Sequence, residues 1–309
     1  MRQSSALTIT LLIILSSCQI DFQPKSTEEG SENTLPTPPL ERDLDKNWAP
    51  HSADLRGYFQ IKGVDGDPLP DQSELTVVGP ESRVSGTGAL IASAPVNKAI
   101  SLNGTFVELN GPGAQMNFGH NEDFSIQSWV KFTGSSSWRR IISNGFADYY
   151  NGFSLQVNPD MGCGETFPGA FYIGLGSGSG AATFQELAVV QTSNGYNDNQ
   201  WHHVVAVYAQ STATKTLTVY IDGQKASISK PQLNSGGCGT YITSCGTITS
   251  DVLDFSACPH ASAGDAWGQT FMGSGRWGGD HFEGSLSEIA IWEVPLSSAD
   301  VNLIYQRQR

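Results

Sequence analysis

Short runs in which apolar and polar residues alternate recur along the chain from residue 48 onward. Successive side chains of a β-strand point to opposite faces, so this period of two is typical of strands that bury one face. The alternation predicts strands over residues 124–130, 153–157, 171–175, 216–221 and 286–292. Pairs of turn residues separate the runs: Asn144-Gly145, Asn151-Gly152, Asn194-Gly195, Asp222-Gly223 and Gly278-Gly279. We therefore expect an all-β fold, an antiparallel β-sandwich or jelly roll.

Two segments depart from this alternation. Residues 203–208 are apolar at almost every position, which predicts a central strand covered on both faces. The adjacent His202 and His203 would then point to opposite sides of that strand, so the pair is not expected to ligate one metal ion. Near the end, Ser297 to Asp300 matches a capping box and apolar residues follow it, which predicts one short C-terminal helix.

Composition and charge narrow the function. The chain has 309 residues with 34 glycines and 15 prolines, which speaks against a fold of long helices. Its net charge of −13 disfavours binding to nucleic acid or to an anionic membrane through charge, because both need a basic surface. Hydrophobic residues make up 39% of the chain, too many for a wholly disordered protein.

The N-terminal segment predicts export. Residues 6–15 are mostly apolar but too short to span a bilayer, which takes about 20 residues, and they fit the apolar region of a signal peptide. Leu15-Ser16-Ser17-Cys18 resembles the bacterial lipobox. The resemblance implies a signal peptide over residues 1–17 and a lipid on Cys18, and Gln19 in place of aspartate favours the outer membrane or cell surface. The alternative is an ordinary secretory signal with an incidental cysteine.

Residues 18–47 are rich in acids and prolines and have little to bury, so we expect an extended, disordered linker. A domain over residues 48–309 would follow, in which 230–268 reads as an irregular insertion rich in glycine, serine and threonine. Four cysteines remain after Cys18, and an even number in an exported chain suggests two disulfides among three possible pairings. Of these pairings we favour Cys238 with Cys245 and Cys163 with Cys258. The sequence contains no Cys-x-x-Cys pair, so a zinc site is not supported.

Several segments together resemble one family. They are 55–59, 99–109, 124–131, 201–204 with 219–223, and 282–297. In this order they resemble the strands and last helix of the laminin-G-like, concanavalin A-like jelly-roll family, which also contains the pentraxins. The resemblance implies two curved antiparallel sheets packed face to face. It also implies binding of carbohydrate or protein, often with calcium, although some relatives are glucanases.

A glucanase would need two carboxylates about 5–5.5 Å apart for a retaining reaction. The candidate pair here is Glu288 and Glu293, which point to opposite faces of a regular strand, and Ala290 occupies the place of the central acid. We therefore assign no catalytic residue and expect a protein that is not an enzyme.

The resemblance places two loops close together, residues 138–151 and 273–280. Their candidate ligand-binding residues are Trp138, Arg139, Tyr149, Tyr150, Arg276 and Trp277. Aromatic rings stack on sugars and guanidinium groups grip carboxylates, so these loops suit a polyol or an acidic sugar. The alternative is that the rings fold inward and close the sandwich end.

Calcium is a further candidate, with Asp148, Asn151 and Asp280 as ligands, although glycines and Arg276 replace acids of the family pattern. We expect a lipoprotein of the bacterial cell envelope, anchored only by its lipid, whose domain binds a carbohydrate or protein ligand in recognition or adhesion and does not bind nucleic acid. The alternatives are a glucanase-type hydrolase and a purely structural envelope component.

Overall fold

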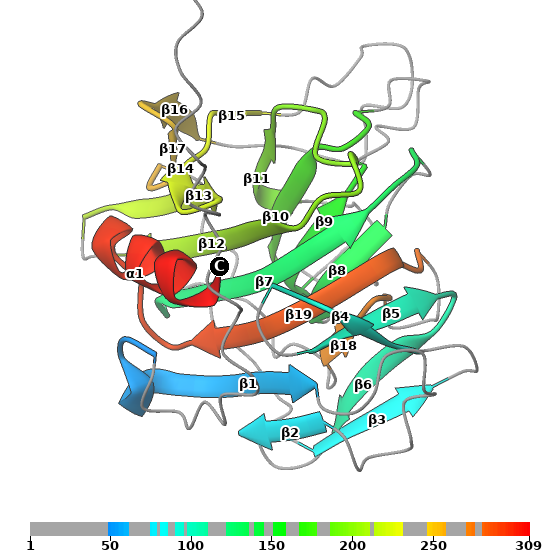
Figure 1. The fold of residues 1–309 in the computed structure, drawn as a ribbon. Helices are drawn as coiled ribbons and strands as arrows, with labels where there is room; N and C mark the ends of the chain where they lie inside the picture. The colour runs from blue at the N-terminus through cyan, green and yellow to red at the C-terminus, as the bar shows by residue number, and fades with distance from the viewer. Residues whose placement is uncertain are drawn as a thin grey trace, which may run out of the picture. The chain divides into compact units, whose positions relative to one another are not determined.

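The computed structural model describes residues 49–61, 75–78, 81–85, 90–95, 98–110, 122–135, 139–144, 151–158, 167–177, 186–210, 213–230, 246–257, 270–275 and 280–309. Within these ranges the chain forms two antiparallel sheets and one C-terminal helix (Figure 1). All five cysteines lie outside the described residues, so lipidation and disulfide pairing stay predictions. None of the helices described is long and apolar enough to cross a membrane.

The first sheet has eleven strands in the described part of the chain. Their spatial order is β16 (Thr247–Thr249), β17 (Val252–Asp254), β13 (Lys215–Ile221), β12 (His202–Gln210), β7 (Phe124–Phe132), β19 (Glu283–Trp292), β1 (Leu55–Ile61), β5 (Lys98–Asn103) and β4 (Leu90–Ser93). In addition, β14 (Gln224–Lys225) pairs with β13, and β2 (Leu75–Val78) pairs with β1.

The second sheet has eight strands in the same described ranges. Their order is β15 (Ile228–Ser229), β11 (Glu186–Thr192), β10 (Phe171–Ser177), β9 (Asn151–Val157), β8 (Arg139–Asn144), β18 (Thr270–Met272), β6 (Phe106–Asn110) and β3 (Glu81–Ser85). The predicted strands over 124–130, 153–157, 171–175, 216–221 and 286–292 are therefore confirmed.

The main core fills the space between the inner faces of the two sheets. Phe124, Phe153 and Phe171 lie in it, together with aliphatic side chains of both sheets. Along β12, Val204 and Ala206 face this core, while Val205 and Val207 face a second apolar cluster on the outer side. The prediction that residues 203–208 form a central strand covered on both faces is thus confirmed.

Helix α1 (Ser298–Gln308) covers that outer side of the eleven-stranded sheet (Figure 1). Its Val301 and Ile304 pack with Tyr58, Trp292 and the outward side chains of β12. Ser297 is the N-cap, and its hydroxyl accepts a hydrogen bond from the backbone N–H of Asp300 in a complete capping box, as the sequence predicts.

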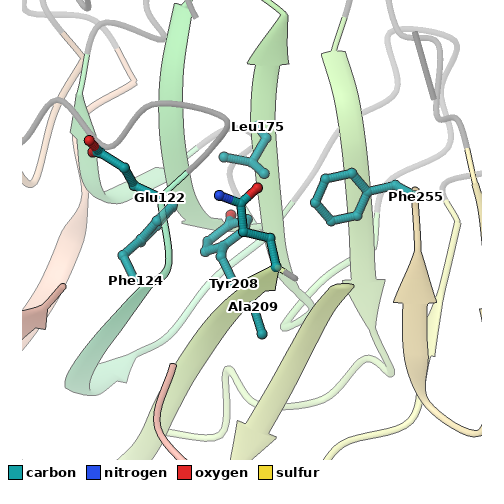
Figure 2. A pocket seen from close by; sticks show the side chains of 7 residues that line it. Glu122, Phe124, Leu175, Tyr208, Ala209 and Phe255 are labelled. Atoms are coloured by element: carbon teal, nitrogen blue, oxygen red, sulfur yellow. The ribbon is translucent and has the colours of Figure 1, made fainter. Parts of the chain in front are cut away.

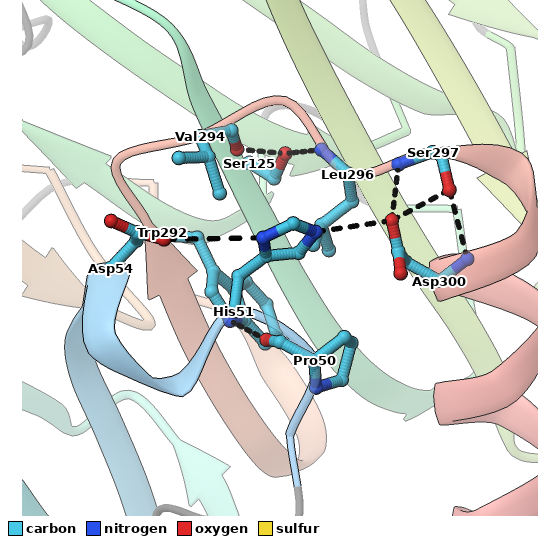
Figure 3. Close-up of polar contacts among 9 residues, drawn as sticks. All are labelled: Pro50, His51, Asp54, Ser125, Trp292, Val294, Leu296, Ser297 and Asp300. Carbon is cyan, nitrogen blue, oxygen red and sulfur yellow. Dashed lines mark hydrogen bonds and ion pairs between the residues drawn. The ribbon is translucent and has the colours of Figure 1, made fainter.

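The start of the domain meets this helix (Figure 3). His51 lies 3.9 Å from the carboxylate of Asp54, which ends the 3₁₀ helix η2 (Ser52–Asp54), and 3.4 Å from that of Asp300. Burial acts to raise the pKa of Asp300, but hydrogen bonds from Ser297 and the charge of His51 outweigh burial and lower the pKa. The indole N–H of Trp292 donates to the carbonyl of Pro50 at 3.1 Å. The entry of the domain is therefore fixed to its last strand and helix.

The structure corrects three expectations. Residues 99–109 are not one strand: β5 and β6 belong to different sheets and are joined through Gly104. Asn151-Gly152 is not a turn but the beginning of β9. The expected insertion over 230–268 is not wholly irregular, because its described part forms β16 and β17, which extend the larger sheet and place Leu253 in the main core.

Candidate ligand-binding face

Two of the candidate ligand residues have side chains in the described part, Arg139 and Asp280. The others lie outside it: Trp138, Asp148, Tyr149, Tyr150, Arg276 and Trp277, while Asn151 is described only as backbone at the start of β9. Whether the aromatic rings meet a ligand or close the sandwich end therefore stays a prediction.

Arg139 ties the two sheets together at the edge where β8 begins. Its Nη1 donates to the carbonyl of His281 at 2.8 Å, and its Nη2 lies 3.1 Å from the carboxylate of Glu283, the first residue of β19. Both terminal nitrogens of this guanidinium are thus committed to partners within the fold.

Asp280 is held by Arg140, a residue that sequence reasoning missed. Arg140 is only 5% exposed, and its Nε and Nη2 lie 3.0 and 2.9 Å from the same carboxylate oxygen, Oδ2 of Asp280. Oδ2 of Asp280 is thus already bound by a guanidinium group. Among the described residues, no three acidic, histidine or cysteine side chains gather to hold a metal ion. Calcium binding elsewhere in the loops stays a prediction.

Arg140 is one end of a row of residues on β8, β9, β10 and β11, which are successive neighbours in the eight-stranded sheet (Figure 1). The register places Gln191 of β11 opposite Tyr172 of β10, Tyr172 opposite Gln156 of β9, and Gln156 opposite Arg140 of β8. Directly opposite residues share a face of the sheet, and the residues flanking Gln156 along β9, Leu155 and Val157, lie in the core. These four side chains, the polar row, therefore belong to the outer face of the eight-stranded sheet.

Small and aromatic residues adjoin the polar row on the same face. Gly174, Ser154 and Ser143 stand opposite one another on β10, β9 and β8, and Phe271 of β18 stands opposite Ser143. The ring of Phe271 meets that of Phe106 edge to face, with centroids 5.9 Å apart, and Phe106 also stacks on His281 at 6.0 Å. The face thus combines amide and hydroxyl groups with an aromatic cluster, and its amide and hydroxyl groups are buried.

Several atoms of this face have no hydrogen-bond partner in the described part of the chain. They are Nε2 and Oε1 of Gln156, Oε1 of Gln191 and Oγ of Ser154. All three side chains are less than a tenth exposed. A buried polar group without a partner destabilises a fold by about 1–3 kcal/mol, so such groups call for a specific reason. The sequence shows the alternation in Phe153–Val157. Alternation alone predicts that Ser154 and Gln156 face solvent, so the burial of these two side chains could not be predicted from it.

By contrast, His202 and Asp222 bind one another and so stabilise the fold. The imidazole of His202 lies 2.9 Å from Asp222 through Nδ1 and 3.2 Å from Asp198 through Nε2. Partial burial acts to lower the pKa of His202, but the hydrogen bonds and charges of Asp222 and then Asp198 outweigh burial and raise it above its ordinary value.

His203 sits on the other face, beneath helix α1. It is fully buried, its Nε2 lies 3.3 Å from Oε1 of Gln127, and its ring stacks at 5.8 Å on Tyr305. Burial lowers the pKa of His203 to about 3, against an opposing effect of the Asp222 charge, so the side chain is neutral near pH 7. The two histidines therefore point to opposite sides of β12, as the sequence predicts.

The two acids considered for a glucanase do not share a site. Glu288 occupies a bulge in β19 with a φ of 48°, is 1% exposed, and accepts a hydrogen bond from the hydroxyl of Tyr58 on the helix side of the sheet. Glu293 is exposed and forms an ion pair with Arg56. A bulge in the strand could have brought Glu288 and Glu293 to the same face. In this structure the bulge buries Glu288 instead.

A shallow pocket opens at one end of the sandwich, between the two sheets (Figure 2). It is lined by Glu122, Phe124, Leu175, Tyr208, Ala209, Gln210 and Phe255. It offers about 20 Å³ to a water-sized molecule, which is space for one or two waters. A sugar ring does not fit in this pocket.

Comparison with known proteins supports the fold. The family described as the concanavalin A-like lectin/glucanases superfamily matches residues 103–244. These residues include β6 to β15 of both sheets and all four members of the polar row. None of the curated proteins matches the sequence.

Solved structures show more distant similarity. Domain 4 of AbnA, an extracellular GH43 arabinanase from Geobacillus stearothermophilus, in complex with arabinotriose, is 15% identical with a TM-score of 0.46, over 80% of this chain and 100% of that domain. The binding domain of botulinum neurotoxin DC in complex with rat synaptotagmin II is 14% identical with a TM-score of 0.45, over 83% of this chain and 52% of that one. The chain thus spans about half the length of the neurotoxin domain. Similarity at this level does not assign a ligand.

Proposed function

We propose that residues 48–309 form a domain of the concanavalin A-like lectin/glucanase type, whose family matches residues 103–244, and that this domain binds a carbohydrate or protein ligand, with a glycan as the better candidate. The predicted binding site is formed by the loops 138–151 and 273–280, and the domain acts by recognition. Fold alone does not fix function, so the proposal depends on the site.

The observation that carries it is the match of residues 103–244, which include most of the eight-stranded sheet, to the family described as concanavalin A-like lectin/glucanases. The predicted contact residues are the aromatic and arginine side chains of the loops 138–151 and 273–280. Aromatic rings stack on sugars and guanidinium groups bind carboxylates, so these loops suit a glycan. The polar row is buried and is not offered to a ligand, since Gln156 is 0% and Gln191 6% exposed.

The rest of the proposal concerns location. Cys18 is the lipid-bearing N-terminus of the mature protein, and residues 18–47 hold the domain off the bacterial outer membrane. This rests on the resemblance to the lipobox and on the acidic, proline-rich composition that follows.

We propose a binding role without catalysis. In support, Glu288 and Glu293 are committed to Tyr58 and Arg56 and do not face one another. Release of reducing ends from laminarin or lichenan by the purified chain would overturn this part, provided that a Glu288→Gln variant no longer releases them.

A glycan array with the purified full chain, with and without calcium, tests the binding role. We expect retention of a defined group of glycans. If the chain binds no glycan on the array and no polysaccharide in solution, glycan binding is refuted and a structural role in the envelope is favoured.

A further inference from the structure

Helix α1 rests on two kinds of surface. Val301 and Ile304, in its first half, pack in the apolar cluster with Trp292 and the outward side chains of β12. Tyr305 and Gln308, in its last turns, contact polar and aromatic side chains of β7 and β12 instead. The two halves of the helix are therefore held to the sheet by different interactions.

Gln308 fixes the end of the helix through a buried cluster of hydrogen bonds. Its Oε1 accepts from the indole N–H of Trp129 at 3.0 Å and from Nε2 of Gln127 at 3.4 Å. Oε1 of Gln127 in turn lies 3.3 Å from Nε2 of His203. Gln127, His203 and Gln308 are each 0% exposed, and Trp129 is 3% exposed. These four side chains, the Gln308 cluster, join the last turns of α1 to β7 and β12.

The Gln308 cluster accommodates His203 only as a neutral ring. Nε2 of Gln127 donates to the backbone carbonyl of Glu288 at 3.0 Å, so Oε1 of Gln127 is the acceptor and Nε2 of His203 carries the proton. Nδ1 of His203 is then an acceptor, and it is buried with no hydrogen-bond partner in the described part of the chain. A protonated ring would place a second N–H at this position without an acceptor, so the docked helix disfavours protonation.

The charged groups around His203 do not offset this cost. Asp222, directly after β13, accepts from the backbone N–H of His203 at 2.9 Å, and its charge favours a proton on the ring, but burial outweighs that charge and lowers the pKa to about 3. On β19, Glu288 accepts a hydrogen bond from the hydroxyl of Tyr58. Further charged or titratable side chains of the neighbouring elements are Lys131, Tyr220, Lys225, Tyr305, Arg307 and Arg309.

We propose that the last turns of α1, residues 305–308, form an acid-released latch: they lift from β7 and β12 as His203 takes up a proton, while the sandwich stays folded. This opening brings the outer side of His203 into water without breaking a strand pairing, because β12 remains bonded to β7 and β13. The first half of the helix keeps its capping box and its apolar contacts. The latch does not depend on the proposed ligand.

Hydrogen–deuterium exchange of the full chain between pH 4.5 and 7.5 tests the latch. Dividing the intrinsic exchange rate at each pH by the observed rate gives protection factors for the amides of residues 305–309 and of the core strands. The open state binds a proton near pH 6.5 and the closed state only near pH 3, so protection at 305–309 should fall about tenfold for each pH unit below 6.5. It should also stay lower than the protection of β7 and β12 at every pH. Protection at 305–309 that is independent of pH, or equal to that of the core strands, would overturn the proposal.

Two variants separate the proton from the hydrogen bonds. His203→Gln removes the titrating ring and retains an amide donor toward Gln127, so protection at 305–309 should lose its pH dependence. Gln308→Leu removes the acceptor of the Gln308 cluster, so protection should fall at every pH while its pH dependence stays. His281→Gln is the matched control and should behave as the wild type does, because this histidine stacks on Phe106 of the other sheet.

Two outcomes would contradict the assignment of the latch to these residues. One is a pH dependence that persists in His203→Gln, and the other is unchanged protection in Gln308→Leu. If His203→Gln does not fold, the wild type and Gln308→Leu decide, since a latch requires both the tenfold dependence on pH in the wild type and the loss of protection in Gln308→Leu.

Discussion

His202 and His203 are neighbours in the chain, but only His202 lies between two acids, while His203 is buried against Trp129 and Tyr305 with no acid side chain bonded to its ring in the described structure. The pKa of His202 is consequently raised and that of His203 is lowered to about 3. One strand thus carries two histidines whose protonation affects the stability of the fold in opposite directions.

His203 should make the fold sensitive to acid. The unfolded chain binds a proton at this side chain near pH 6.5, whereas the folded chain binds it only near pH 3. Below pH 6.5 the unfolded state therefore holds more protons, and the free energy of unfolding should fall by up to about 1.4 kcal/mol for each pH unit. Urea unfolding of the wild type and His203→Gln between pH 4.5 and 7.5 measures this. The variant will be less stable overall but should show a shallower slope, and equal slopes would contradict the prediction.

His202 should contribute in the opposite direction. Its raised pKa means that the stabilisation from Asp222 and Asp198 is fully present below pH 6.5 and is lost as the pH rises through the raised value. The difference in unfolding free energy between the wild type and His202→Gln should be about 1–2 kcal/mol at pH 6 and should shrink toward pH 8.5. A difference that is constant over this range would show that the charge of His202 has no part in it.

Gly223 should be required for docking of helix α1. Its φ is +77°, and a Cβ there would lie 2.7 and 3.0 Å from the ring atoms Cδ1 and Cγ of Tyr305. Gly223→Ala should therefore lower the free energy of unfolding by about 2–4 kcal/mol, from backbone strain and overlap together. Gly104→Ala is the control, because its φ of +75° is similar but no atom lies within 4 Å of the added Cβ. Equal losses in the two variants would rule out a contribution from Tyr305.

Asp280 should matter for stability through Arg140. Asp280→Asn removes the charge of a carboxylate that binds the 5% exposed guanidinium of Arg140, and because Asp280 itself is 40% exposed we expect a moderate loss of about 1–3 kcal/mol. Glu293→Gln, which breaks the exposed pair with Arg56, should lose less than about 1 kcal/mol. Chemical unfolding of both variants measures the two losses. A larger loss in Glu293→Gln than in Asp280→Asn would contradict the stabilising role of the pair Arg140–Asp280.

Cys18 should determine membrane attachment. Acyl chains bind a bilayer by about 0.8 kcal/mol for each buried CH₂ group, so the wild type should sediment with membranes and Cys18→Ala should not. Membrane fractionation with detergent extraction measures the distribution. A variant that still sediments with membranes and is released only by detergent would refute lipid anchoring through this residue.

The sandwich could be predicted from the sequence because most of its strands alternate apolar and polar residues, β12 is apolar on both faces, and its helix begins with a capping box. The face of the eight-stranded sheet could not. Gln156, Tyr172 and Gln191 come together only through strand order, and a polar residue in an alternating strand reads as exposed whether or not it is buried. Arg140 was hidden for the same reason, since its partner Asp280 follows 140 positions later in the chain. Asn151-Gly152 was mistaken for a turn because the pair has turn-forming residues, whereas pairing with β8 and β10 extends β9 through it.

The position of β19 has a consequence for the kinetics of folding. This strand is the last of the chain, yet it lies in the middle of the larger sheet and pairs with β1, β5 and β7. Its partner β1 is the first strand of the described residues, so their pairing joins residues from opposite ends of the domain and must overcome a large loop-closure entropy. On the proposed export route, residues 283–292 are the last strand to cross the inner membrane, so the edges of β1, β5 and β7 that pair with β19 stay unpaired until then. This interval is when the chain is most exposed to aggregation and most in need of a chaperone.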